Sequence, residues 1–187
     1  MKINLGCGKN YIPGFVHVDL DEHPHIDHRS NVKDLSFFEN NSAELIYSSH
    51  TLEYFDRKEV VDVLSEWYRV LKPEGVLRIA VPDFEAIVKV YKKYNDLDHQ
   101  GILGPLYGFW PYKSTCDKID TFYHKTTYDF NSLKKLLFTS GFSDVKRYAW
   151  ENTIHKDYDD HSQAYYPNMD KDNGLLISLN IEATKHV

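Results

Sequence analysis

Short apolar runs alternate along this chain with longer segments in which apolar residues recur at helical spacing. Six runs have the length and composition of buried strands: Ile3–Leu5, Phe15–Leu20, Glu44–Ser48, Val76–Val81, Phe142–Trp150 and Leu175–Ala183. Strands that alternate with helical segments are typical of an α/β sheet built from crossover units. The pattern therefore predicts an α/β fold.

Three segments between the runs have helical patterns: Arg57–Leu71, about Asp83–Tyr94 and about Phe130–Ser140. In the first, an apolar stripe is formed by Val60, Leu64, Trp67 and Leu71. Asp129 precedes the third segment as an N-cap and Gly141 follows its end, so both boundaries carry the expected signals. Between the first two strands, Pro13 and Gly14 leave room for barely a turn or two of helix.

Two stretches show neither the apolar runs of a strand nor the apolar spacing of a helix. Residues 95–128 combine glycines and prolines with aromatic residues, which favours an ordered insertion that could form a lid. Residues 151–173 are polar and rich in Asp and Tyr, and we expect a long loop there. At 187 residues the chain has the usual size of one domain, so we expect a single domain over 1–187.

The charge balance narrows the range of partners. The formal net charge is -6, which argues against a phosphate-binding face for nucleic acid. No stretch approaches the roughly 20 apolar residues of a membrane span. Cys7 and Cys116 are the two cysteines, too few to indicate a disulfide framework, so a reducing cytoplasm is the simpler expectation.

One glycine loop follows the first strand directly. Gly6-Cys7-Gly8 allows the backbone to turn sharply and approach a ligand without an intervening Cβ, and the second strand ends near Asp19. Neighbouring parallel strands end at the same sheet edge, so the Asp19 carboxylate is placed to accept hydrogen bonds from ribose hydroxyls. These residues alone predict a nucleoside site of unspecified kind, and a simple turn with a solvated acid is the plain alternative.

The rest of the chain resembles the class I S-adenosylmethionine-dependent methyltransferases, specifically the group called methyltransferase type 11. The first motif and acidic strand of that family are matched by Asn4–Gly8, Pro13–Phe15 and Val18–Leu20. Later motifs are matched by Ser42–Phe55, Arg69–Gly75, Val81–Asp83, His124–Lys125, Leu133–Leu137 and Gly141–Phe142. The resemblance covers nearly the whole chain apart from residues 95–122 and residues 151–173.

This resemblance implies a Rossmann-like doubly wound sheet of seven strands, mostly parallel, with helices on both faces and an antiparallel last strand. It also implies methyl transfer from S-adenosylmethionine to a small molecule or a glycan precursor, with S-adenosylhomocysteine as product. Carried over by position, the cofactor-binding residues are Asn4, Gly6, Cys7, Gly8, Asp19, Leu20, Asn31, Val32, Ser49 and His50.

The chain departs from the family at a few positions. The family usually has an acid four residues before the leucine that is Leu35 here, and this chain has Asn31, whose amide oxygen can still accept from the adenine amino group. Asp34 is the rival for that contact. Tyr54 replaces a common histidine and Glu74 replaces a common glycine.

A catalytic base is harder to identify than the cofactor site. His124 stands between the insertion and the last predicted helix and is the candidate that removes a proton from a hydroxyl or amine acceptor. The alternative for His124 is a helix-entry residue that hydrogen-bonds the backbone. Cys7 has no neighbour in sequence that would activate it as a nucleophile, so we expect it to pack as a small side chain.

Three other functions are each compatible with part of the sequence. His23, His25 and His28, with nearby aspartates, invite a metal site, but no cysteine supports it and we expect no metal. A non-catalytic cofactor-binding or partner module is consistent with the lack of a compelling base. A nicotinamide-dependent oxidoreductase would also use Asp19, but the third glycine of the dinucleotide fingerprint is absent.

Overall fold

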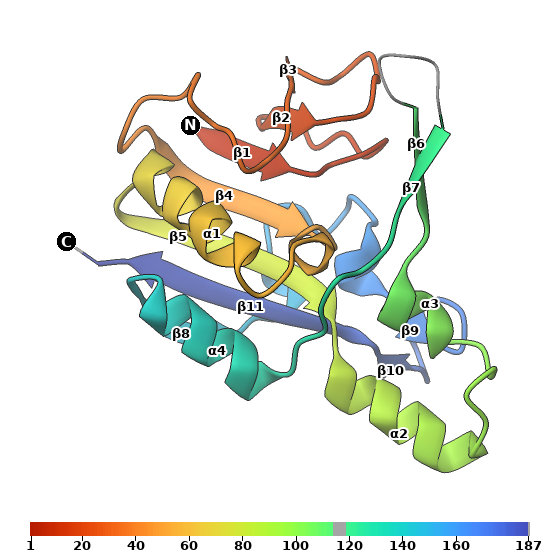
Figure 1. Cartoon of the computed structure of the whole chain (residues 1–187). Coiled ribbons are helices and arrows are strands. Elements are labelled where there is room, and N and C mark those ends of the chain that lie inside the picture. The colour runs from red at the N-terminus through yellow and green to blue at the C-terminus, as the bar shows by residue number, and fades with distance from the viewer. Residues whose placement is uncertain (114–118, 187) are drawn as a thin grey trace.

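The computed structural model describes residues 1–113 and 119–186. A seven-stranded sheet with the order β3-β2-β1-β4-β5-β11-β8 forms its centre (Figure 1). The strands of this sheet are β1 (Lys2–Leu5), β2 (Val16–Asp19), β3 (His28–Arg29), β4 (Ala43–Ser49), β5 (Leu71–Pro82), β8 (Phe142–Arg147) and β11 (Ser178–Lys185). The helices are α1 (Glu59–Val70), α2 (Phe84–Tyr94), α3 (Leu103–Tyr107) and α4 (Phe130–Thr139).

The direction of the strands agrees with the predicted sheet. Neighbours from β3 to β5 pair in parallel, whereas β11 pairs antiparallel with both β5 and β8. The last strand of the chain is therefore the antiparallel one, and it lies between β5 and β8 instead of at an edge. The predicted α/β class, with seven mostly parallel strands and an antiparallel last strand, is confirmed.

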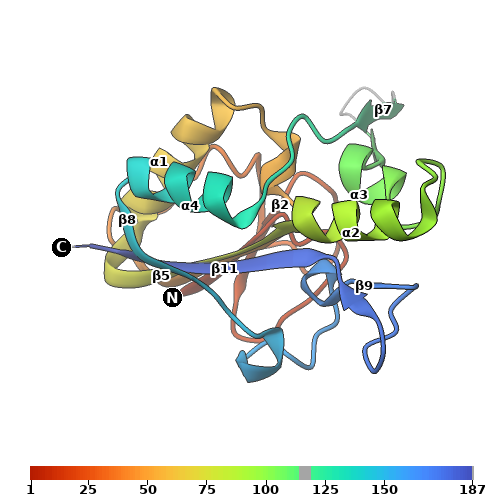
Figure 2. The same cartoon turned by 90° about the horizontal axis from the view of Figure 1, so that it is seen from below.

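Helix α1 forms as its apolar stripe predicts, and it covers one face of the sheet together with α4 (Figure 2). Trp67 of α1 is fully buried, and its indole N–H donates a 2.8 Å hydrogen bond to the carbonyl of Val32. The segment after β3 is thus fixed against the helix. At the start of α4, the Asp129 side chain accepts from Ser132 N in a capping box, which confirms the predicted N-cap.

The other face of the sheet has no helix between β1 and β2. Residues 6–15 connect these strands through turns only, because so few residues leave no length for a helix packed on the sheet. The loop segment, residues 148–174, lies on this side (Figure 2). Its His155 is fully buried and stacks on Tyr47 of β4, with ring centroids 4.0 Å apart. Helices were expected on both faces, but on this side their place is taken by the loop segment, which contains no α-helix.

The predicted loop and insertion both contain regular structure. Strand β9 (Tyr165–Tyr166) pairs with β10 (Leu175–Leu176), and two 3₁₀ turns, η2 (Trp150–Asn152) and η3 (His161–Gln163), precede β9. In the insertion, α3 is followed by the antiparallel strands β6 (Trp110–Lys113) and β7 (Ile119–Phe122). Cys116, and with it part of the predicted lid, falls outside the described residues.

Candidate functional site

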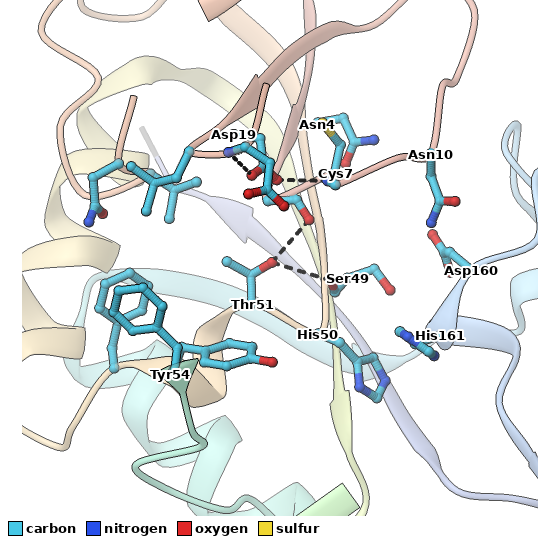
Figure 3. Close-up of a pocket in the computed structure, with 18 of the residues that line it drawn as sticks. Asn4, Cys7, Asn10, Asp19, Ser49, His50, Thr51, Tyr54, Asp160 and His161 are labelled. Carbon is cyan, nitrogen blue, oxygen red and sulfur yellow. Dashed lines mark hydrogen bonds between the residues drawn. The ribbon is translucent and has the colours of Figure 1, made fainter. Parts of the chain in front are cut away.

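A cavity of about 560 Å³ opens where β1, β2 and β4 end (Figure 3). Its lining combines polar groups from the strand ends with aromatic side chains from the insertion. The lining residues are Asn4, Gly6, Cys7, Gly8, Lys9, Asn10, Asp19, Leu20, Asp21, His23, Asn31, Val32, Lys33, Ser49, His50, Thr51, Tyr54, Phe55, Glu59, Phe109, Phe122, Lys125, Asp160 and His161. This position at the carboxyl ends of parallel strands is where α/β sheets bind ligands.

The glycine loop forms one wall of the cavity. Gly6 has a φ of 68°, in the left-handed region, and a Cβ on it would lie 2.1 Å from Oγ1 of Thr51. Gly8 also has a positive φ, but a Cβ there would meet nothing within 4 Å. Gly6 is therefore required by the packing of the loop against Thr51, whereas Gly8 leaves open space beside the cavity.

Asp19 holds this loop in place. One oxygen of its carboxylate accepts from the backbone N–H of Gly8 at 2.7 Å, and the other accepts from the N–H of Asp21 at 2.8 Å. The side chain is almost completely buried, and burial raises the pKa of its carboxyl group above the ordinary value, while the backbone N–H groups of Asp21, Gly8 and Leu20 oppose the shift. Each carboxylate oxygen has a second lone pair with which it can accept from a ligand.

All ten residues that the sequence assigns to a cofactor line this one cavity, from Asn4 at β1 to His50 after β4. Their roles in binding stay predictions. For the adenine contact, the structure separates the two rivals: Asn31 lines the cavity, whereas Asp34 is exposed and accepts from the N–H of Ser36. Cys7 is buried, and burial raises the pKa of its thiol to about 12, which leaves it protonated.

The histidines after β2 do not gather around a common point for a metal. Within residues 1–113 and 119–186, no group of three or more His, Cys, Asp or Glu side chains is placed to hold an ion. His25 instead donates from Nε2 to the carbonyl of Gly8 at 3.1 Å and packs edge-on against the ring of His17. His25 therefore helps to hold the glycine loop at Gly8.

A second cavity of about 300 Å³ adjoins the first and shares His50, Tyr54, Phe109 and His161 with it. The rest of its lining is Gly104, Pro105, Gly108, His124, Ala164 and Ile177. The predicted base, His124, thus lies in this second cavity and not beside the glycine loop. Its Nδ1 donates to the carbonyl of Pro105 at 2.9 Å, and burial lowers the pKa of its imidazole.

Glu53 lies between two of these histidines and was not singled out from the sequence. It is fully buried, and neither oxygen makes a hydrogen bond. Its Oε1 lies 3.4 Å from Nδ1 of His50 and 3.7 Å from Nε2 of His124. Burial raises the pKa of Glu53 to about 8, so the protonated acid predominates at neutral pH.

The hydrogen bonds assign the tautomers of both rings. Ser178 donates to Asn180 and therefore accepts from Nε2 of His50 at 3.0 Å, just as the carbonyl of Pro105 accepts from Nδ1 of His124. The remaining nitrogen of each ring carries a lone pair that faces Glu53. Burial also lowers the pKa of His50 well below its ordinary value, so one carboxyl proton lies between two neutral imidazoles.

Two further lining residues come from the loop segment. Asp160 and His161 border the cavity, and His161 lies beside His50 with ring centroids 5.3 Å apart (Figure 3). Sequence reasoning missed both because a polar stretch without periodicity shows no relation to strand ends more than 100 residues earlier. Thr51, the residue that packs on Gly6, was quoted within a family motif but given no role.

Comparisons with known proteins agree with this geometry. A family model described as a methyltransferase domain matches residues 5–79, which include the glycine loop, Asp19 and the segment after β4. Solved S-adenosylmethionine-dependent methyltransferases superpose on the whole sheet. The chain has the class I methyltransferase fold. The fold that the sequence resemblance implies is thereby confirmed.

Among these methyltransferase-fold structures, a protein from Methanosarcina mazei is 18% identical, with a TM-score of 0.55, over 100% of this chain and 92% of its own. A second, from Archaeoglobus fulgidus, is 17% identical, with a TM-score of 0.56, over 98% of this chain and 85% of its own. A third is the 1,6-didemethyltoxoflavin-N1-methyltransferase of Burkholderia thailandensis, solved with S-adenosylhomocysteine. It is 14% identical, with a TM-score of 0.54, over 100% of this chain and 71% of its own.

No curated protein matches the chain in sequence. Within the described residues, none of the helices has the length and apolar character needed to cross a membrane. The methyltransferase assignment of the fold therefore rests on the family model and on the solved structures.

The contact between Gly6 and Thr51 can be tested against a matched glycine. Gly6→Ala and Gly14→Ala both place a Cβ on a residue with positive φ, but only the first would clash with Thr51. We expect Gly14→Ala to lower the free energy of unfolding by about 1 to 2 kcal/mol and Gly6→Ala by a further 1 to 3 kcal/mol. Urea denaturation measures both, and equal losses would contradict the close packing at Gly6.

The raised pKa of Glu53 predicts that the stability of the protein depends on pH. Its carboxyl group ionises near 4.5 in the unfolded chain and near 8 in the folded one, so between these values the wild type loses stability as pH rises. Glu53→Gln cannot ionise, and its stability relative to wild type should increase by on the order of 2 kcal/mol from pH 5 to pH 7. Exposed Glu151→Gln is the control, and parallel curves for Glu53→Gln and wild type would show that Glu53 ionises normally.

Proposed function

We propose that this protein is an S-adenosylmethionine-dependent methyltransferase that acts on a small-molecule or glycan-precursor acceptor and releases S-adenosylhomocysteine. The observation that carries the proposal is the convergence of the ten assigned residues, from separate segments of the chain, on one cavity at the carboxyl ends of the strands. A non-catalytic binding module is not favoured, because a second cavity with ionisable groups adjoins the first.

In this proposal the nucleoside occupies the side of the cavity nearest β2. The Asp19 carboxylate accepts from the ribose hydroxyls with the lone pairs that Gly8 and Asp21 leave free. Leu20 and Val32 provide apolar contacts for the adenine, and the amide of Asn31 reaches its amino group. Gly6–Gly8 then face the ribose and the methionine portion.

When bound, S-adenosylmethionine supplies a methyl group that its sulfonium already makes electrophilic. The task of the chain is to align the acceptor with that methyl group and to exclude water. Phe109 and Phe122 of the insertion and Tyr54 after β4 line the cavity and provide apolar surface for this purpose. The insertion, about 95–128, acts in this proposal as the lid of a single domain, in a cytoplasmic enzyme.

The acceptor occupies the second cavity in this proposal, next to His124. The Nε2 atom of His124 carries the lone pair, because Nδ1 donates to Pro105, and this atom is the base that takes a proton from a hydroxyl or amine. Glu53, 3.7 Å away, is protonated in most molecules at neutral pH, and in the fraction that has lost this proton to solvent its carboxylate stabilises the resulting imidazolium. A positive charge on His124 is unfavourable without such a partner, because burial already lowers its pKa.

Calorimetric titration with S-adenosylmethionine tests the proposed cofactor. Asp19→Asn removes the charge that ribose hydroxyls recognise, and we expect affinity to fall about 100-fold, since hydrogen bonds to charged groups contribute about 1.5 to 3 kcal/mol each. Asp34→Asn is the matched control, because Asp34 is acidic but outside the cavity. Circular dichroism confirms that both variants fold. Unchanged affinity in Asp19→Asn would refute the proposed site.

A further inference from the structure

The loop segment, residues 148–174, does more than cover the sheet face that lacks a helix. It carries Asp160 to the edge of the first cavity, where the chain beyond the glycine loop is too short to form a helical wall. Figure 3 places Asp160 beside Asn10, away from Asp19. The Asp160 carboxylate therefore lines the part of the cavity that lies away from Asp19 and the proposed nucleoside position.

Two hydrogen bonds hold this carboxylate in position. One oxygen accepts from the hydroxyl of Tyr47 at 2.6 Å, and the other accepts from the N–H of Ser162 at 2.7 Å, where Asp160 caps η3. Tyr47 is fully buried in β4, and burial, together with the negative charge of Asp160, raises the pKa of its phenol well above the ordinary value. The hydroxyl thus keeps its proton and donates to Asp160.

A carboxylate that is oriented in this way and still borders a cavity is suited to bind a cation. The amide of Asn10 can donate to an anionic oxygen, so an acceptor for an ammonium group and a donor for a carboxylate lie side by side. This pair complements the two charges of an α-amino acid.

We propose that Asp160 binds the α-ammonium group of the amino-acid tail of S-adenosylmethionine and S-adenosylhomocysteine. The inference rests on the proposed function, and it adds that the loop segment selects ligands that carry this tail. Tyr47 is a positioning residue, because it acts on the ligand only through Asp160. Asp160 caps η3 as well, so a purely structural role is the alternative that an experiment must exclude.

Two ligands separate these roles. S-adenosylhomocysteine carries the amino-acid tail, whereas 5′-methylthioadenosine has the same adenosine and a thioether but no ammonium group. Asp160→Asn keeps an oxygen that can accept from Tyr47 or Ser162 but removes the charge. By calorimetry we expect its dissociation constant for S-adenosylhomocysteine to rise 10- to 100-fold and that for 5′-methylthioadenosine to stay within twofold.

Asp157→Asn is the matched control, because it removes the same charge from an exposed position of the same segment. It should leave both affinities unchanged, which excludes a long-range electrostatic effect. Tyr47→Phe keeps the ring in the core and removes the hydroxyl. We expect it to weaken binding of S-adenosylhomocysteine less than Asp160→Asn does, and to leave binding of 5′-methylthioadenosine unchanged.

Equal weakening of both ligands by Asp160→Asn, or no weakening of either, would overturn the inference and leave Asp160 a structural cap. Binding of both ligands by the wild type would support the proposed function in either case. If the wild-type protein bound neither compound, the proposed cofactor itself would be wrong and the inference would fail with it.

Discussion

The hydrogen bond from the N–H of Gly8 to the carboxylate of Asp19 joins the ends of the first two strands and shapes the cavity. It is possible only because the chain turns back at Gly6, where the left-handed backbone and the contact with Thr51 exclude a side chain. The same acid that fixes the loop then offers its remaining lone pairs to a ligand. Loop shape and ligand recognition therefore depend on one side chain.

The second constraint is the short link between β1 and β2. A chain of this length cannot place a helix on the sheet, so the apolar residues of that face, among them Tyr47, need another cover. The loop segment provides it, with His155 stacked on Tyr47 and Asp160 bound to the Tyr47 hydroxyl. One tyrosine of β4 thus connects the covering of the core to the edge of the cavity.

Much of the fold could be predicted from the sequence because its signals are local. The stripe that includes Trp67 and the N-cap Asp129 depend on neighbours within a few residues, and both appear as expected. The sequence also indicated that little helix fits around Pro13. It could not indicate what replaces that helix, because the contact between Tyr47 and Asp160 spans 113 residues and leaves no periodic pattern.

The candidate site likewise contains residues that the sequence could predict and residues that it could not. Gly6 and Asp19 could be found because a glycine loop and an acid at adjacent strand ends have a fixed geometric relation. Glu53 could not be found, because its character depends on burial between His50 and His124, which only the folded chain brings together. Asn31 stands at the position of the family's acid and Asp34 was its rival from the sequence, and of the two Asn31 lines the cavity.

A crystal structure of the protein with S-adenosylhomocysteine tests the central claim most directly. We expect the ribose hydroxyls on the Asp19 carboxylate, the adenine against Leu20 and Val32, and the thioether sulfur near the junction of the two cavities. Ligand bound elsewhere on the protein, or ribose hydroxyls without contact to Asp19, would contradict it.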